Sequence, residues 1–363
     1  MKIQTLEMSG ISKRFGSVEA NRGVSLRLQS GEVLGLLGEN GAGKTTLMKI
    51  LYGLIPADQG EIRINGHPVR LRSPRDAIAR GIGMVHQHFL LVQNHTVAEN
   101  VALGFPESPF LFPARRVGRL LQEFGRRYGL AVNPQARIWQ LSAGEQQRVE
   151  ILKALLAGAD LLILDEPTSV LTPREAEELF AVLRRMSAEG HSVIFISHKL
   201  EETLALCRRV VVLRKGEVAG ETSTDGVDKR ELARMMVGRE IMFNLHKKKL
   251  QPGPVVLEVE NLTVVGDRAN IAVRGVSFRI RRGEILGIAG VSGNGQRELV
   301  EAITGLRRVS SGVVRLNGAE LTNASARVAA SRGIAHVPEE RLRFGIVPNL
   351  FIHENLSLIH ISE

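Results

Sequence analysis

The 363-residue sequence predicts an α/β fold with a mainly parallel sheet, present in one complete copy and one partial copy. Three observations support this prediction. Continuous apolar runs of strand length occur at residues 33–37, 161–164 and 193–196, as expected for parallel strands buried on both faces. The first two runs lead through a turn into a helical pattern, as α/β units do. The pattern of residues 23–81 also recurs at residues 275–333.

The amino-acid composition limits the class of protein but does not identify its binding partner. The hydrophobic fraction of 44% is ample for buried cores, and the net charge of +10 with a pI near 10.1 fits nucleic acid, an anionic membrane surface or a polyphosphate ligand. Lys and Arg are scattered, which favours a solvated basic surface. The single cysteine, Cys207, excludes an internal disulfide and suits a reducing compartment. No signal peptide or apolar run near 18 residues is found, so we expect a partner to hold the chain wherever it works at a membrane.

A glycine-rich segment between the first apolar run and a helical pattern at residues 47–51 fits G-x-x-x-x-G-K-[ST], the phosphate-binding P-loop. Its residues are Gly38, Glu39, Asn40, Gly41, Ala42, Gly43, Lys44, Thr45 and Thr46. Glycines let backbone N–H groups turn toward a polyphosphate, and the helix N-terminus adds positive potential. We expect Lys44 to reach the β- and γ-phosphates and the Thr45 hydroxyl to hold Mg²⁺.

The flanking segments predict short elements around this loop. Residues 3–28 alternate between apolar runs and turns, as strands do, and residues 60–66 form a strand pattern ending in Asn-Gly. Residues 73–81 predict a short helix and residues 82–85 a buried strand. Phe15 lies in a turn-rich segment, where either an exposed ring for stacking on a purine or a half-buried core ring fits.

Residues 96–140 are mostly helical in pattern and broken by four prolines, which predicts an inserted helical subdomain. A strong helix follows, and Ser142 and Glu145 have the spacing of a capping box at its start. Ser142 and Gly144 at a helix N-terminus also form an anion site. Because the first half already has its own P-loop, a second phosphate site implies contact with the nucleotide of another copy.

Polar residues follow three of the predicted strands. Asp165 comes directly after an apolar run, the Walker B arrangement, where a carboxylate can hold Mg²⁺ and its water shell. Glu166 comes next and could orient or deprotonate an attacking water. Gln87 and His198 each follow a predicted strand. Without this context, Gln87 would be interpreted as a surface amide and His198 as a structural histidine. The carboxyl ends of parallel strands are where such sheets bind ligands, so we expect His198 near the γ-phosphate.

The repeat has a constant offset of 252 residues, which indicates a duplicated domain. We predict a first domain at residues 1–242, a linker at 243–254 and a partial second domain at 255–363. In the second P-loop Gln296 replaces the lysine and Arg297 replaces the hydroxyl residue, so we expect poor hydrolysis there. Glu339 matches Gln87, and we expect residues 356–363 to be a non-native tail of a truncated reading frame.

Taken in order, the P-loop, Gln87, the Leu-Ser-Ala-Gly-Glu-Gln segment at 141–146, the Asp165–Glu166 pair and His198 resemble the ATP-binding-cassette (ABC) ATPases. The resemblance covers residues 1–242 and, as a partial second cassette, 255–363. It implies ATP and Mg²⁺ as cofactors and a closed dimer with each ATP between one P-loop and the opposite Ser142–Gly144–Glu145 signature. By position it also implies that Phe15 stacks on adenine and that Gln87 senses Mg²⁺ and a membrane partner.

Two tandem cassettes, a short linker and a degenerate second P-loop look like the ATPase subunit of bacterial simple-sugar and nucleoside importers. The segments at residues 85–89, 96–100 and 168–173 look closest to the nucleoside-type branch. The resemblance implies membrane permease subunits, a periplasmic or lipoprotein solute-binding protein, and a place on the cytoplasmic face of the membrane. It also implies pairing with a second cassette, in cis or as a homodimer. Thr172 departs from the aspartate that many cassettes carry after Walker B.

The alternative is a soluble tandem cassette that acts on ribosomes or nucleic acid. Such proteins usually carry two intact sites and a long charged linker helix. Residues 243–254 are too short for that helix, and Gln296 argues against a second intact site. We therefore expect no nucleic-acid partner. The transported solute contacts the permease and a capture protein, so these residues carry no signal for its identity.

Overall fold

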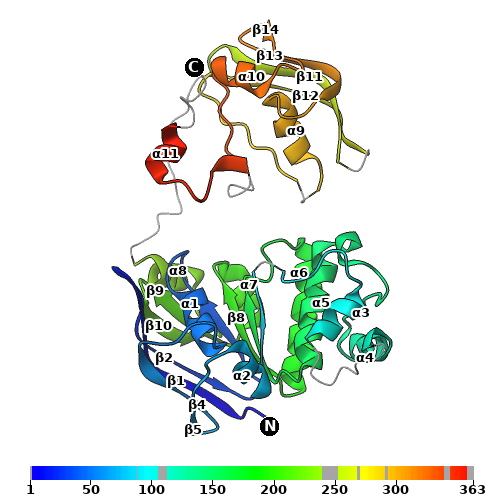
Figure 1. Cartoon of the computed structure of the whole chain (residues 1–363). Helices are drawn as coiled ribbons and strands as arrows, with labels where there is room; N and C mark the ends of the chain where they lie inside the picture. The colour runs from blue at the N-terminus through cyan, green and yellow to red at the C-terminus, as the bar shows by residue number, and fades with distance from the viewer. Residues whose placement is uncertain are drawn as a thin grey trace. The chain divides into compact units, whose positions relative to one another are not determined.

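The computed structural model describes residues 2–87, 89–104, 113–238, 252–267, 270–290, 293–338 and 344–357. Two compact units, residues 1–245 and 246–363, divide the chain, and each is described by itself (Figure 1). Several sequence predictions fall outside the described residues: His88, most of the linker at 243–251, two P-loop positions at 291–292, Glu339, and the tail at 358–363.

The first unit is built on a six-stranded sheet in the order β10-β9-β3-β8-β7-β6. Five strands are parallel, and β10 pairs antiparallel with β9 at one edge. The strands are β3 (Val33–Leu37), β6 (Ile82–Val85), β7 (Leu161–Asp165), β8 (Ser192–Ser197), β9 (Arg209–Arg214) and β10 (Glu217–Ser223). Every residue of β3, β6, β7 and β8 is buried. This confirms the fold class read from the continuous apolar runs.

A second, antiparallel sheet in the order β2-β1-β4-β5 completes the strand content of the first unit. Its strands are β1 (Thr5–Phe15), β2 (Val18–Gln29), β4 (Gln59–Ile64) and β5 (His67–Val69). Apolar and polar residues alternate along β2, and the buried side chains Val24, Leu26 and Leu28 face inward. The alternation is typical of a sheet with one face on the core and one in water.

Helices cover the parallel sheet and form a separate group at one end of the unit. They are α1 (Lys44–Leu51), α2 (Pro74–Ala79), α3 (Val97–Leu103), α4 (Pro113–Tyr128), α5 (Ala143–Leu156), α6 (Pro173–Ala188), α7 (Leu200–Leu206) and α8 (Lys229–Val237), with a 3₁₀ turn η1 (Ile138–Gln140). Helices α3, α4 and α5 lie together (Figure 1). Helices α3 and α4 and the turn η1 lie within the predicted helical subdomain at residues 96–140, and α5, which begins after it, packs against α3 and α4.

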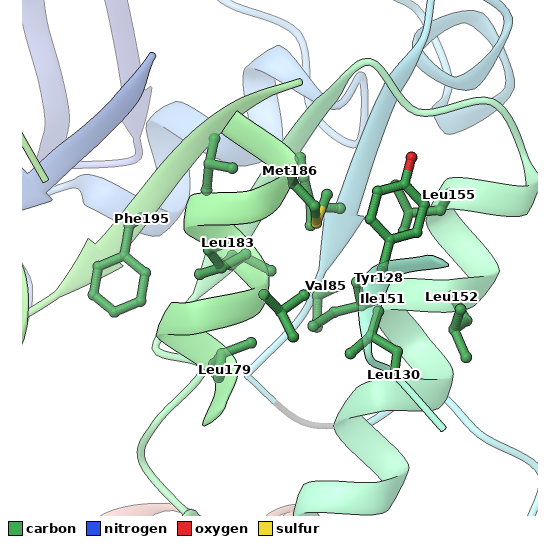
Figure 2. Packing of buried hydrophobic residues seen from close by; sticks show 14 of the residues in the cluster. Val85, Tyr128, Leu130, Ile151, Leu152, Leu155, Leu179, Leu183, Met186 and Phe195 are labelled. Atoms are coloured by element: carbon green, nitrogen blue, oxygen red, sulfur yellow. The ribbon is translucent and has the colours of Figure 1, made fainter. Parts of the chain in front are cut away.

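Two apolar clusters fill the two faces of the parallel sheet. In β8, Val193 and Phe195 belong to the cluster shared with the helices, whereas Ile194 and Ile196 belong to the one shared with the antiparallel sheet. Figure 2 shows the first cluster, where side chains of α5 and α6 interdigitate around Val85. The sheet is therefore fixed on both sides, so its carboxyl edge is a rigid platform.

Local sequence sets where the key helices begin. Ser142 and Glu145 form the predicted capping box at the start of α5: Glu145 N–H donates to Ser142 Oγ at 3.2 Å and Ser142 N–H donates to Glu145 Oε2 at 2.8 Å. Thr172 and Glu175 form another at the start of α6, with Pro173 at the first helical position. Thr172, at the predicted departure from the family pattern, is thus the N-cap of α6.

The second unit repeats the antiparallel sheet, in the order β12-β11-β13-β14. Its elements are β11 (Val255–Val265), β12 (Ile271–Arg281), β13 (Val309–Leu316) and β14 (Ala319–Glu320), with α9 (Gln296–Ile303), α10 (Ala326–Ser331) and α11 (Ile352–Ser357). Residues 285–289, which match β3 by the repeat, form no strand, and Ile285 is 97% exposed. In the first unit β3 pairs with β8 and β9, whose counterparts would have numbers above 363.

Among the described residues, no helix is long and apolar enough to cross a bilayer.

Candidate nucleotide-binding site

The P-loop connects the carboxyl end of β3 to the start of α1. Glu39, Asn40 and Gly41 are exposed at its tip, while Ala42 and Lys44 are buried at its base. Gly43 has a φ of 100° and lies against β2, where a Cβ would overlap the Ala20 carbonyl oxygen. Only glycine fits both the left-handed backbone and this close approach. The free N–H groups of the first turn of α1 are thereby aimed at the space above the loop.

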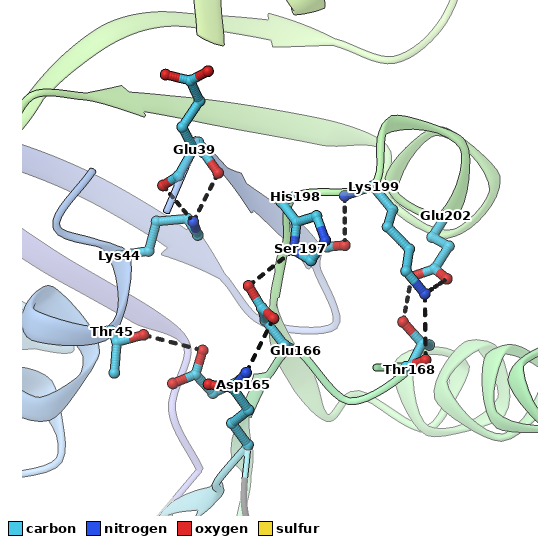
Figure 3. A network of polar contacts seen from close by, with 12 residues as sticks. Glu39, Lys44, Thr45, Asp165, Glu166, Thr168, Ser197, His198, Lys199 and Glu202 are labelled. Atoms are coloured by element: carbon cyan, nitrogen blue, oxygen red, sulfur yellow. Dashed lines mark hydrogen bonds and ion pairs between the residues drawn. The ribbon is translucent and has the colours of Figure 1, made fainter. Parts of the chain in front are cut away.

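Lys44 folds back over the loop that carries it. Its Nζ donates to the carbonyl oxygens of Gly38 at 2.7 Å and Glu39 at 3.0 Å (Figure 3). Burial lowers the pKa of Lys44, and the nearby Glu166 and Asp165 carboxylates partly offset this. Among the described residues, the hydrogen-bond partners of the ammonium are these two backbone carbonyls, and a phosphate would be a stronger partner for it.

Thr45 and Asp165 meet across the end of the sheet. Thr45 Oγ1 donates to Asp165 Oδ1 at 3.3 Å, joining α1 to the last residue of β7. Asp165 is buried, and this burial raises the pKa of its carboxyl while the Thr45 hydrogen bond acts in the opposite direction. A hydroxyl and a buried carboxylate at this separation are oxygen donors of the kind that Mg²⁺ prefers.

Glu166 lies at the centre of a polar cluster at the carboxyl ends of three strands. His198 Nδ1 lies 2.9 Å from Glu166 Oε1, and Gln87 Nε2 donates to Glu166 Oε2 at 3.3 Å (Figure 3). Glu166 has a φ of 48°, an uncommon backbone for a residue other than glycine. Its N–H donates to the Ile196 carbonyl at 3.0 Å, which fixes this backbone against β8. The structure thus brings together three residues predicted separately.

The signature segment lies apart from this cluster. Ser142 and Gly144 are at the N-terminus of α5, and in the described part of the chain no hydrogen bond or ion pair joins residues 142–145 to the P-loop. Gly144 packs closely on α6, where a Cβ would lie 2.5 Å from Glu175 Oε1. The two segments predicted to bind phosphate therefore lie apart within one unit.

The family described as ABC transporter matches residues 21–169 and 273–362 of this sequence. The matched residues include the P-loop, the signature and the Asp165–Glu166 pair. The chain belongs to the ABC transporter family. The second matched stretch agrees with the internal repeat and covers the partial second cassette.

Curated relatives in this family are similar over nearly all of the chain. The glucose import ATP-binding protein TsgD13 of Haloferax volcanii is 48% identical, with 99% of this chain and 70% of the relative covered. The guanosine import ATP-binding protein NupO of Bacillus subtilis is 46% identical, covering 97% and 69%. The ribose import ATP-binding protein RbsA 1 of Rubrobacter xylanophilus is 46% identical, covering 99% and 71%.

Solved ABC cassettes share the fold of the first unit. A nucleotide-free ATP-binding cassette from an ABC transporter has a TM-score of 0.57 at 23% identity, covering 66% of this chain and all of that one. The dimeric bacterial cassette MJ0796 has a TM-score of 0.54 at 26% identity, covering 61% of this chain and all of that one. The predicted family, fold and ATP-binding role are thus confirmed.

The second cassette carries its substitutions in a similar backbone frame. Gly295 precedes α9 with a φ of 92°, as Gly43 precedes α1. Gln296 lies over Gly290. In the first cassette the corresponding residue, Lys44, lies over the corresponding glycine, Gly38. Arg297 pairs with Asp267, the residue at the repeat position of Phe15. Glu339, the match for Gln87, lies outside the described residues.

Phe15 is at the end of β1 with 49% of its surface exposed, and the Lys13 ammonium lies 5.6 Å from its ring centre. An exposed ring leaves a face for stacking, which is one of the two alternatives that the sequence left open.

Sequence reasoning missed a partly buried polar network behind the Walker B turn. Thr168 is buried and donates to Glu202, and Lys199 Nζ donates to the Thr168 carbonyl at 3.3 Å and to Glu202 Oε1 at 2.9 Å (Figure 3). These contacts tie the turn after Glu166 to the start of α7. The only signal in the sequence is the i,i+3 spacing of Lys199 and Glu202, which is common on helix surfaces.

Proposed function

We propose that this chain is the ATP-hydrolysing subunit of an ABC importer and drives uptake of nucleosides or simple sugars through a separate permease. The observation that carries the proposal is the convergence of Lys44, the Thr45–Asp165 pair and the Glu166–His198 pair at one edge of the sheet. The relatives named above, import ATP-binding proteins for glucose, guanosine and ribose, support the solute class.

In this proposal the residues of the first cassette divide the work of hydrolysis. The N–H groups of residues 38–46 and the Lys44 ammonium bind the β- and γ-phosphates and offset charge on the transferred phosphoryl group. Glu166 orients the attacking water and accepts its proton. His198 holds one Glu166 oxygen and Gln87 the other, so that the carboxylate keeps one orientation. Phe15 stacks on the adenine.

The donor set at Thr45 and Asp165 fits Mg²⁺, which would screen phosphate charge when bound. A single buried carboxylate and a hydroxyl leave most coordination positions to phosphate and water, as is usual for this ion. Gln87 is the third residue that we propose near the ion.

We further propose that Ser142, Gly144 and Glu145 complete the site of another cassette. The Ser142 hydroxyl accepts the Glu145 N–H at 3.2 Å, which leaves its own proton to donate to a phosphate. The separation of this segment from the P-loop of the same unit supports pairing between cassettes, in cis or between two chains.

The permease would bind beside Gln87. Four large apolar side chains in the segments around this loop are exposed: Leu90 (66%), Val92 (44%), Leu103 (69%) and Trp139 (50%). They belong to segments held together by backbone bonds, such as Trp139 N–H to the Gln93 carbonyl at 3.2 Å. An apolar surface rimmed by polar groups is suited to an amphipathic helix of a partner. Such docking would hold the chain peripherally on the cytoplasmic face of the membrane, with a solute-binding protein acting on the far side.

The domain boundaries at residues 1–242, 243–254 and 255–363 are part of the same proposal. They are supported by the division of the chain into two units near residue 245.

Reconstitution tests this function. The chain would be combined in liposomes with candidate permease subunits and a solute-binding protein from the same organism, and uptake of labelled guanosine, ribose and glucose would be measured with and without internal ATP. ATP-dependent uptake of one of them is expected. ATPase activity stimulated by ribosomes or RNA, with no uptake, would favour the alternative of a nucleic-acid factor.

A further inference from the structure

The base of the first P-loop is held from outside by a side chain that no motif includes. Asn21 lies on β2 and is fully buried. Its Nδ2 donates to the Gly43 carbonyl oxygen at 3.2 Å, and the same oxygen accepts the Leu47 N–H at 2.9 Å. That second bond is the first one inside α1. Asn21 therefore contacts the peptide group from which the phosphate-facing helix starts.

Two backbone bonds fasten the neighbouring part of the loop. Gly216, in the turn between β9 and β10, donates its N–H to the Ala42 carbonyl at 3.1 Å and accepts the Arg22 N–H at 2.8 Å. Residues 42–43 are thus held between β2 and this turn. Among these three contacts, the bond from Asn21 is the one made by a side chain, so it can be removed by substitution.

Only the nitrogen of the Asn21 side-chain amide forms a hydrogen bond. Its Oδ1 is buried and has no hydrogen-bond partner among the described residues. An unsatisfied buried acceptor is destabilising, because the group has lost water and gained nothing in return. The stability of the fold alone therefore does not explain an asparagine at this position.

The second cassette provides an internal comparison. The residue at the repeat position of Asn21 is Val273, which is 5% exposed and packs in the apolar cluster with Leu299. The backbone at this point is the same in both units: a Cβ on Gly295 would overlap the Ala272 carbonyl oxygen, as one on Gly43 would overlap that of Ala20. Leu299 N–H donates to the Gly295 carbonyl at 2.9 Å. A valine is therefore compatible with the loop–strand contact and with the start of the helix.

We propose that Asn21 is a positioning residue for nucleotide binding at the first P-loop, and that it acts by fixing the Gly43 peptide rather than by stabilising the fold. Its cassette keeps Lys44 and Thr45, whereas the cassette with Val273 carries Gln296 and Arg297. The asparagine thus accompanies the intact phosphate site. The inference rests on the proposed binding of ATP at this loop.

The test exchanges the two residues in the full chain. Asn21→Val is expected to weaken the Kd of a fluorescent ATP analogue about fivefold to tenfold, the effect of losing one or two neutral hydrogen-bond contributions. Its Tm should stay unchanged or rise, because the orphan acceptor is removed. The matched control Val273→Asn should leave the Kd within about twofold, since it alters the other cassette by the same chemistry.

A weaker Kd together with an unchanged or higher Tm in Asn21→Val would distinguish a positioning role from a structural one. A lower Tm with an unchanged Kd would show that Asn21 only supports the fold, and a Kd that does not change in any variant would also overturn the proposal. Asn21→Leu, which keeps the branched shape without the amide, serves as a second variant should the valine form fail to fold. A wild-type chain that bound no ATP would instead overturn the nucleotide site itself.

Discussion

His198 Nδ1 lies 2.9 Å from Glu166 Oε1, so the residue that follows β8 fixes the carboxylate that follows β7. The two residues are 32 positions apart in the sequence and come from adjacent parallel strands. This contact gives Glu166 a fixed orientation at the edge of the sheet, beside the Thr45–Asp165 pair. The first prediction follows from it.

Glu166→Gln should abolish most hydrolysis and leave ATP binding intact. The amide keeps the size of the side chain but cannot accept a proton from water, and loss of a general base typically costs ~10²- to 10⁴-fold in rate. Steady-state ATPase activity of the assembled transporter measures the first effect, and nucleotide affinity the second. Glu178→Gln, a change at an exposed position of α6 that removes ion pairs with Arg148 and Arg174, is the control. Unchanged turnover in Glu166→Gln would contradict the role of Glu166.

Lys44→Ala should reduce ATPase activity far more than Gln296→Ala does. Lys44 supplies positive charge to the transferred phosphoryl group, and removal of such a stabilising group costs about 10²- to 10³-fold. Gln296 carries no charge, so its removal should alter ATPase activity little. The measurement is the ATPase activity of the assembled transporter carrying each change. Equal losses in both variants would mean that the second P-loop also hydrolyses ATP.

ATPase activity of this 363-residue chain should depend on its concentration. Residues 1–363 contain one Leu-Ser-Ala-Gly-Glu-Gln signature, at 141–146. In a polypeptide of these 363 residues, the proposed composite site requires Ser142 of another molecule to close on the intact P-loop. Specific activity should rise with concentration at low protein concentration, where dimerisation limits the rate. Activity that stays flat on dilution well below micromolar would contradict the composite site or require a much tighter dimer.

Cysteines placed near Gln87 should crosslink to a membrane partner. His88 and Phe89 follow Gln87 in the sequence; His88 lies outside the described residues, and Phe89 is partly buried against the helical subdomain. His88→Cys and Phe89→Cys in the assembled transporter should give products with the permease. A cysteine at Val218, an exposed position on β10, is the control and should give none. Products confined to the ATPase itself would argue against docking at this loop.

Cys207 should react with thiol reagents only when the first unit unfolds. The thiol is 3% exposed, and burial raises its pKa far above the usual range, so the reactive thiolate is scarce in the folded protein. Raising the pH from 7 to 9 should therefore accelerate labelling of a small free thiol but not of the native chain. Heating through the Tm should expose it. Rapid labelling of the folded chain at 25 °C would show that the α7–β9 region opens locally.

Local patterns were enough to predict the fold class and the family. Continuous apolar runs predict buried parallel strands because both faces of such a strand exclude water. A P-loop can be recognised from sequence because its glycines, its lysine and its hydroxyl residue all lie within nine consecutive positions. The capping box of Ser142 and Glu145 is readable for the same reason, since its hydrogen bonds join residues three apart. Predictions of this kind need no knowledge of distant contacts.

Tertiary structure decided which distant residues meet. The sequence placed Gln87 and His198 after strands, but only the order β3-β8-β7-β6 brings both to Glu166. Asn21 carried no signal in the sequence at all, because its role depends on the approach of β2 to Gly43. A hydrogen bond is short and directional, so its partners are set by the path of the whole chain. The sequence by itself thus determined the class of chemistry, and the packing of the sheet determined how its residues are arranged to perform it.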